Sequence, residues 1–208
     1  MSRLENAWYE RAWWLYLLWP VAMPFQGLGY CRRMLQASDP ASNKVPVVIV
    51  GNLSVGGTGK TPIIMALSNY LKSNGINPGI VSRGYGGNSK SYPLVVDAQS
   101  DSAIVGDEPK LIASACEIPV VVDPDRRRAL EYLLAQHEVD VVLSDDGLQH
   151  YRLPRDYEIV VVDGARLFGN ELTLPAGPLR EPLSRLRSVD CVIVNGSGGS
   201  GRSAKRSP

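Results

Sequence analysis

The sequence predicts an α/β fold with a mainly parallel sheet and flanking helices, preceded by an aromatic N-terminal helix. Three observations support this fold class. Short runs rich in Val and Ile recur along the chain, segments with apolar residues at helical spacing lie between several of them, and residues 12–31 carry no charge but three of the four tryptophans. Strands that alternate with helices indicate parallel pairing through right-handed crossovers.

Composition indicates a folded domain, because 44% of the 208 residues are apolar and 21% are charged. The 22 Lys and Arg residues nearly balance 21 Asp and Glu residues, so no nucleic acid partner is expected. Cys31, Cys116 and Cys191 are far apart and odd in number, which argues against a disulfide framework or a zinc site. Their pattern fits a reducing compartment.

The first element, residues 1–40, is predicted to contain a membrane-interfacial helix. Pro20, Pro24 and nearby glycines interrupt the apolar run after about a dozen residues, fewer than the roughly 20 that a spanning helix needs. Glu5 and Glu10 precede the run, where a signal peptide would be positively charged. The aromatic side chains suit a bilayer interface and nearby arginines suit anionic headgroups. The alternative is a helix that packs on the domain.

The second unit, residues 41–196, is predicted to form the α/β core. Helices are expected where apolar spacing is helical, at 61–73, 107–116 and 125–137. In such sheets the ligand lies beyond the carboxyl ends of the strands. Strands buried on both faces are expected at 45–52, 78–84, 119–123, 139–146, 157–164 and 189–196. The remaining Gly/Ser/Arg stretch, 197–208, is predicted to be a disordered tail.

A Gly-rich loop follows the first core strand and precedes a predicted helix, which is the order found in a P-loop. Glycines let consecutive backbone N–H groups converge on an anion, and the helix N-terminus favours negative charge. Lys60 would reach the β and γ phosphates, and the Thr61 hydroxyl would bind Mg²⁺. Ser54 departs from the usual pattern, which has glycine there. The predicted phosphate-binding residues are Ser54, Val55, Gly56, Gly57, Thr58, Gly59, Lys60 and Thr61.

The nucleotide is expected to be ATP, by elimination. A GTPase would normally show Asn-Lys-x-Asp after a late strand. Here the last predicted strand ends in Asn195-Gly196-Ser197-Gly198, which lacks that Lys and Asp.

Acidic residues follow two of the buried segments. Asp145 and Asp146 lie just beyond a predicted strand, where P-loop proteins hold Mg²⁺, although Asp-Asp-Gly is also good turn chemistry. Asp107 begins a predicted helix and is either a functional carboxylate or a helix cap. Arg83 lies in SRGYGG after another strand, which is either a simple turn or part of the site.

Five motifs in one order resemble the tetraacyldisaccharide 4'-kinase family of lipid A and lipopolysaccharide biosynthesis. They are GNLSVGGTGKTP, SRGYGG, VGDEP, SDDGLQH and the segment VVVDGARLFGNELTLPAGPLREPLSRL. The resemblance runs from the aromatic helix to Asn195, and it implies a second, C-terminal lobe that this sequence lacks. It also accounts for Ser54. Its implied activity is transfer of the ATP γ-phosphoryl group to the 4'-hydroxyl of a tetraacylated glucosamine disaccharide 1-phosphate at the cytoplasmic face of the bacterial inner membrane.

The resemblance implies roles for single residues. Lys60, Asp107 and Asp146 are the implied catalytic residues, with Asp107 orienting or deprotonating the sugar hydroxyl. The implied Mg²⁺ ligands are Thr61, Asp145, Asp146 and Glu181, and the candidates for binding ATP or substrate phosphate are Arg83, Gln149, His150 and Arg180.

Other functions remain open on the sequence alone. A regulatory or metallochaperone-type NTPase would use the paired aspartates for hydrolysis only. A chain without the second lobe would bind ATP and membrane but transfer phosphate poorly or not at all.

Overall fold

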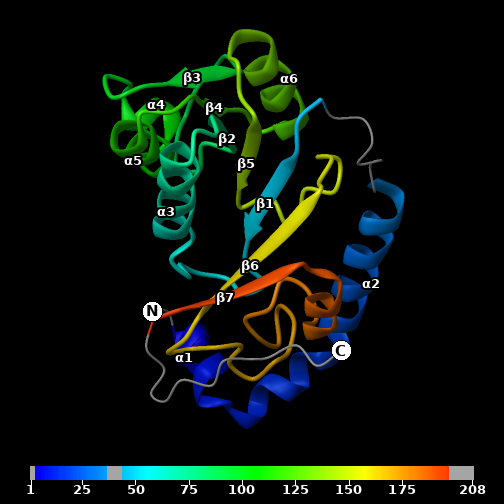
Figure 1. The fold of residues 1–208 in the computed structure, drawn as a ribbon. Helices are drawn as coiled ribbons and strands as arrows, with labels where there is room; N and C mark the ends of the chain where they lie inside the picture. The colour runs from blue at the N-terminus through cyan, green and yellow to red at the C-terminus, as the bar shows by residue number, and fades with distance from the viewer. Residues whose placement is uncertain (1–2, 37–43, 197–208) are drawn as a thin grey trace.

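The computed structural model describes residues 3–36 and 44–196, and it contains one sheet of seven strands in the order β3-β4-β2-β5-β1-β6-β7 (Figure 1). All neighbours are parallel except the antiparallel pair β3 and β4. The predicted tail 197–208 lies outside the described residues. The strands are β1 (Val47–Gly51), β2 (Pro78–Ser82), β3 (Leu94–Val96), β4 (Val120–Val122), β5 (Val141–Asp145), β6 (Tyr157–Asp163) and β7 (Cys191–Asn195).

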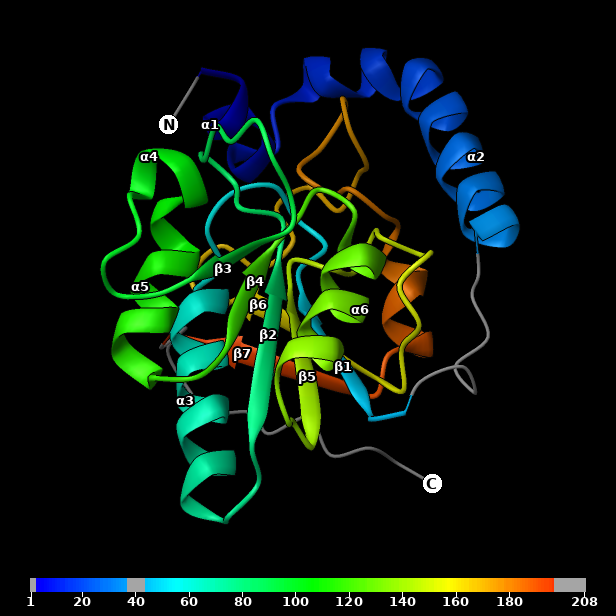
Figure 2. The same cartoon turned by 90° about the horizontal axis from the view of Figure 1, so that it is seen from above.

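Helices cover both faces of the sheet, as the view from above shows (Figure 2). On β1, Val47 and Ile49 pack in one core cluster with Leu130 and Leu133, while Val50 packs in the other with residues of the opposite helices. This alternation explains why the strands are apolar on both sides. The helices of the core are α3 (Lys60–Ser73), α4 (Ser102–Val105), α5 (Asp107–Cys116), α6 (Arg126–Gln136) and the 3₁₀ helix η3 (Leu183–Ser188).

Three N-terminal elements precede the core: α1 (Arg3–Glu10), the 3₁₀ helix η1 (Trp13–Leu18) and α2 (Trp19–Gln36). They lie along the loop segment between β6 and η3 (Figure 1). The Trp8 indole donates to the Pro175 carbonyl at 3.2 Å, and Leu15 is fully buried beside it in a small apolar cluster. The Gln26 amide donates to the Thr173 hydroxyl at 2.8 Å. These contacts join the N-terminal elements to the core.

The expected fold class is confirmed, and all six predicted core strands and all three predicted core helices are present. The expectation that every strand is buried on both faces is wrong for β7, because it is an edge strand and its Val192 and Val194 are exposed. The single helix expected in residues 1–40 is divided into α1, η1 and α2, and α2 continues through Pro24 to Gln36, so this proline shortens the apolar run without ending the helix. Within the described residues, the structure contains no helix long and apolar enough to cross a membrane. The strand β3 and the short helices α4 and η3 were not predicted.

Candidate functional site

The loop between β1 and α3 has the backbone of an anion-binding cradle. Gly56 and Gly59 have φ values of +96° and +79°, which side chains with a Cβ rarely adopt, and Gly59 directly precedes α3. No atom lies within 4 Å of the place where a Cβ of Gly57 would stand. The loop therefore leaves free space in front of the helix N-terminus, where backbone N–H groups favour an anion.

Contacts with the segment before η3 fix the entrance of this loop. The Val55 N–H donates to the Pro178 carbonyl at 2.8 Å, and the Arg180 N–H donates to the Leu53 carbonyl at 2.7 Å. The buried Asn52 amide donates to the Ser54 carbonyl at 2.7 Å and to the Gly56 carbonyl at 3.3 Å. The loop shape is thus set by side-chain and backbone donors, not by glycines alone.

The acidic pair lies beside the loop because β5 is the direct neighbour of β1, with Asp145 opposite Val50. Lys60 Nζ lies 3.5 Å from Asp146 Oδ1. Burial by itself would raise the pKa of Asp146, but the charges of Lys60 and Arg180 outweigh it and lower that pKa. Lys60 and Asp146, two of the predicted site residues, are therefore in contact in the structure, and Asp146 is held as a carboxylate.

Asp145 offers one unpaired oxygen. Its Oδ2 accepts from the Ser82 hydroxyl at 3.3 Å, whereas Oδ1 is buried and has no hydrogen-bond partner within the described residues. Burial, with the nearby charge of Glu108, raises the pKa of Asp145 to about 6. An unpaired carboxylate oxygen at the carboxyl end of a strand fits a hard cation such as Mg²⁺, which commonly uses one or two carboxylates together with phosphate oxygens.

Glu181 is already bonded to neighbouring donors. It accepts from the Tyr151 hydroxyl at 2.6 Å and from the Gln149 amide at 2.9 Å, and Arg185 Nε lies 3.4 Å away. In residues 3–36 and 44–196 no three His, Cys, Asp or Glu side chains are placed to hold a metal ion together. Glu181 as a Mg²⁺ ligand therefore stays a prediction, and its contacts show a carboxylate that holds Gln149 in place.

Arg180 and Gln149 belong to the same group of contacts. Arg180 Nη1 lies 3.1 Å from Asp146 Oδ2 and donates to Gln149 Oε1 at 3.4 Å. A row of polar contacts thus runs from Lys60 through Asp146, Arg180 and Gln149 to Glu181. The predicted residues Lys60, Asp145, Asp146, Gln149, Arg180 and Glu181 are brought together beside the loop.

The other predicted residues take different positions. Asp107 is exposed and makes no ion pair in the part of the chain that the structure describes, and Gly106, not Asp107, is the N-cap of α5. A helix cap is therefore not its role. Arg83 is exposed near the buried Arg126. Burial and the charge of Arg126 lower the pKa of His150 to about 4, so this imidazole is neutral near pH 7 and supplies no charge for phosphate.

Sequence reasoning missed four residues that shape the site. Arg126, buried at the start of α6, donates to the carbonyls of Asp145 and Asp146 at 3.3 Å and 2.9 Å. Arg166 and Asn195 donate to loop carbonyls, and Glu108 acts electrostatically on Asp145. The signals were weak, but Arg166 lies three residues after β6, the neighbour of β1, and Asn195 is the last residue of β7, which pairs with β6.

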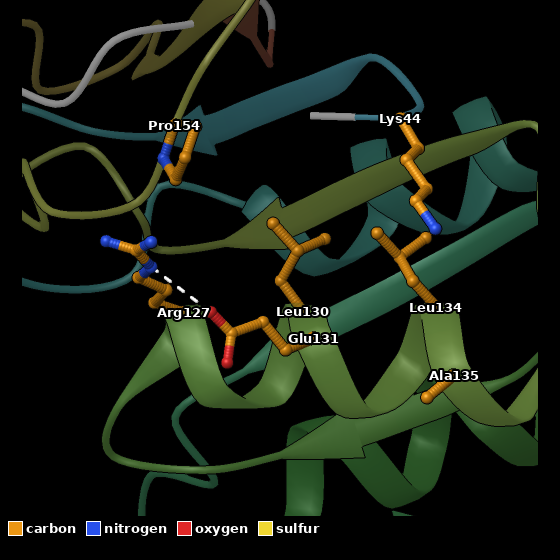
Figure 3. A pocket seen from close by; sticks show the side chains of 7 residues that line it. All are labelled: Lys44, Arg127, Leu130, Glu131, Leu134, Ala135 and Pro154. Atoms are coloured by element: carbon orange, nitrogen blue, oxygen red, sulfur yellow. Dashed lines mark hydrogen bonds and ion pairs between the residues drawn. The ribbon is translucent and has the colours of Figure 1, made fainter. Parts of the chain in front are cut away.

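A separate cavity of about 320 Å³ lies between α6 and the segments before β1 and before β6 (Figure 3). Leu130 and Leu134 form its apolar wall, and Lys44 and Pro154 approach it from the segments before β1 and before β6. None of the predicted site residues lines it. The cavity is therefore separate from the group of predicted site residues beside the loop.

Comparisons with known proteins agree with this geometry. The family model described as tetraacyldisaccharide-1-P 4'-kinase matches residues 14–207. Tetraacyldisaccharide 4'-kinases from Hahella chejuensis and Mannheimia succiniciproducens are 50% and 53% identical over 93% and 91% of this chain, covering 60% and 59% of their own lengths. The crystal structure of LpxK from Aquifex aeolicus in complex with ATP gives a TM-score of 0.77 at 32% identity, covering 92% of this chain and 62% of that one. The chain thus spans about 60% of the length of the relatives it matches.

Proposed function

Because the chain belongs to the tetraacyldisaccharide-1-P 4'-kinase family, we propose that it provides the ATP site of an enzyme that phosphorylates the 4'-hydroxyl of a tetraacylated glucosamine disaccharide 1-phosphate. The observation that carries the proposal is the position of Lys60 and Asp146, 3.5 Å apart, at the start of α3 and the end of β5. The LpxK of Aquifex aeolicus, which has the same fold, was solved in complex with ATP.

The residues of this chain support phosphoryl transfer in distinct ways. The loop N–H groups would bind the β and γ phosphates, and the ammonium of Lys60 would neutralise charge that develops on the transferring group. Thr61 and the unpaired Oδ1 of Asp145 would hold Mg²⁺, which supplies further charge neutralisation when bound. Arg180, which holds Asp146 from the other side, would keep that carboxylate in place.

Asp107 is proposed as the group that accepts the proton of the sugar hydroxyl. It is exposed at the start of α5, where neither an ion pair nor a capping bond in the described structure occupies it. Its neighbour Glu108 acts on Asp145 electrostatically, so the start of α5 faces the acidic pair. A carboxylate without a structural role, on the side of the site open to an acceptor, suits a general base.

The N-terminal elements are proposed to lie on the cytoplasmic face of the bacterial inner membrane as a peripheral or monotopic anchor, where the acylated substrate resides. Trp13, Leu17, Leu28 and Leu35 are 75%, 71%, 71% and 86% exposed. So much exposed apolar surface on consecutive elements is typical of an interface. The exposed Arg32 can meet anionic headgroups.

The test measures transfer from labelled ATP to tetraacyldisaccharide 1-phosphate in detergent micelles. Asp107→Asn is expected to lower the transfer rate by roughly 10²–10⁴-fold and to leave ATP affinity unchanged. Asp101→Asn is the matched control, because the Asp101 side chain caps α4 by accepting from the Ala103 N–H at 2.9 Å, and asparagine caps equally well. If the control transfers phosphate, an equal transfer rate in Asp107→Asn would show that Asp107 is not the general base.

ATP binding is measured separately by titration calorimetry. Binding without transfer by the unsubstituted chain would limit its role to the nucleotide site. No Mg-ATP binding at all would refute the proposed function.

A further inference from the structure

Arg166 lies between the phosphate loop and the N-terminal helix α1. It follows β6 and is 24% exposed at its side chain. Its Nε donates to Asp163 Oδ2 at 2.6 Å, and its Nη2 donates to the carbonyl of Gly57. Its guanidinium carbon lies 5.7 Å from the centre of the Tyr9 ring, within the range of a cation–π contact. One side chain thus contacts β6, the loop and α1.

Asp163 fixes the direction of this arginine. Besides the guanidinium, it accepts from the N–H groups of Ala165 and Arg166 at 2.9 Å and 3.2 Å. These bonds hold the first residues of the turn after β6. The Arg166 side chain, which extends from this turn, therefore has little conformational freedom. A planar guanidinium held on one edge by a carboxylate presents its remaining N–H groups in a defined direction.

The bond to Gly57 acts on the peptide that faces the anion. In a planar trans peptide the carbonyl of one residue and the N–H of the next point in opposite directions. A donor that holds the Gly57 carbonyl outward therefore turns the Thr58 N–H toward the open side of the loop. This is the side on which phosphate is expected.

Asn195 holds the carbonyl of the next residue in the loop in the same way. Its amide donates to the Thr58 carbonyl at 3.2 Å from the end of β7, which turns the Gly59 N–H inward. A Cβ on Gly59 would stand 1.9 Å from this amide nitrogen, so the contact needs glycine. Two adjacent carbonyls of the loop are held from the ends of two adjacent strands.

We propose that Arg166 is a positioning residue, which orients the phosphate loop for anion binding through the Gly57 carbonyl and makes this orientation depend on α1 through Tyr9. The proposal rests on the proposed ATP site and adds a link from the N-terminal helix to nucleotide affinity. Tyr9 belongs to the same helix as Trp8, whose indole is bonded to the core. A displacement of α1 would therefore change the orientation of the phosphate loop through the Arg166 guanidinium.

The first experiment measures the dissociation constant of Mg-ATP for the 208-residue chain in detergent. Arg166→Gln is expected to raise this dissociation constant about tenfold or more. It should weaken the binding of inorganic triphosphate by the same factor, because the loop N–H groups bind phosphate and not the adenine base. Arg127→Gln is the matched control, since Arg127 forms a comparable surface ion pair with Glu131 at 3.2 Å on α6. Its dissociation constant should equal that of the unsubstituted chain.

Arg166→Lys separates positioning from charge. The lysine keeps the positive charge but lacks the planar fork that binds Asp163 and the Gly57 carbonyl together, so binding should stay at least fivefold weaker than in the unsubstituted chain. Recovery to within twofold would show that charge alone matters and would overturn the proposal. If the unsubstituted chain binds Mg-ATP and the dissociation constant of Arg166→Gln is within twofold of its value, the positioning role is overturned as well. That result would leave the proposed function intact.

A double-mutant cycle tests the link to α1. Tyr9→Leu should weaken Mg-ATP about threefold when Arg166 is present and have no effect in the Arg166→Gln background, because the two side chains act through one contact. Equal factors in the two backgrounds would show that Tyr9 acts independently of Arg166 and would overturn the link.

Discussion

Lys60 is the residue through which the loop and the acidic pair meet, since it donates to Asn52 Oδ1 at 3.4 Å and pairs with Asp146. Lys60→Ala should weaken Mg-ATP binding by roughly ten- to a hundredfold. This is the effect expected when a hydrogen bond to a charged group, which contributes about 1.5–3 kcal/mol, is lost. The fold should persist because Arg180 still pairs with Asp146. Titration calorimetry measures the first effect and thermal unfolding the second.

Lys44→Ala provides the control for that substitution. Lys44 lines the cavity beside α6 and contacts none of the site residues in the described structure. Equal Mg-ATP affinity of the two variants would show that Lys60 does not reach the nucleotide.

His150 gives the protein a defined sensitivity to acid. Because burial and Arg126 lower its pKa from 6.5 to about 4, the unfolded chain binds a proton more readily than the folded one. The stability that the neutral imidazole provides is complete above pH 6.5 and is lost as the pH falls toward 4. The full shift corresponds to about 3 kcal/mol, which solvent around the half-exposed ring reduces to about 1–2 kcal/mol.

His150→Gln should therefore reduce the loss of thermal stability between pH 7.5 and pH 5. The measurement compares unfolding temperatures of the two proteins at both values. His137→Gln serves as control, since His137 is the C-cap of α6, at the opposite end of that helix from Arg126. The same loss in His150→Gln as in the unsubstituted protein would assign the acid sensitivity to other groups.

Which site residues the sequence reveals depends on how they act. Residues that act by their own chemistry at the end of a strand, such as Lys60 and Asp146, were found from the motif and its position. Arg166 and Asn195 were missed because they act on backbone carbonyls of a distant loop, and no local pattern encodes such a contact. Glu108 was overlooked because its neighbour Asp107 offered a simpler interpretation. The role of Asp107 and the ligand role of Glu181 stay predictions.

The strands of the core were predictable because burial on both faces makes them continuous apolar runs, as in VVIVG of β1 and YEIVVVD of β6. β3, at the edge of the sheet, was not predicted because its apolar run is the short segment Leu94–Val96 and only Val96 is buried. α2 was predicted as part of one N-terminal helix, and it continues through Pro24 although proline and glycine have poor helix propensity. Intrinsic propensity is a weak guide when contacts such as Gln26 with Thr173 hold the helix against the core.

In the N-terminal elements some large apolar side chains pack against the core and others are exposed to solvent. Trp8 is 5% exposed and is hydrogen-bonded to the core, whereas Trp13 is 75% exposed and Leu17 is 71% exposed. The double substitution Trp13→Ser with Leu17→Ser should therefore reduce sedimentation with anionic vesicles without loosening the fold. Tyr70→Ser, on the 65% exposed Tyr70 of α3, is the control. Unchanged sedimentation of the double variant would place membrane contact elsewhere.

For the whole molecule, ligand binding and stability are linked. A nucleotide that binds only the folded state at 100 times its dissociation constant stabilises it by about 2.7 kcal/mol. For a chain of 208 residues this raises the unfolding temperature by about 5–10 °C. Mg-ATP should give this shift for the unsubstituted chain, and Lys60→Ala should need much higher concentrations. Equal shifts with Mg-GTP would show that the site does not select adenine.

The attachment of α1 to the core by the Trp8 indole has a geometric consequence for how the protein would meet the acylated acceptor proposed for it. A rigid attachment sets the height of the phosphate loop above whatever plane the exposed side chains of η1 and α2 occupy. An acylated acceptor in that plane then approaches by lateral diffusion, and the encounter becomes a search in two dimensions. The number of acceptor molecules per unit area of bilayer, and not their number per unit volume, would govern how often the sugar reaches the loop.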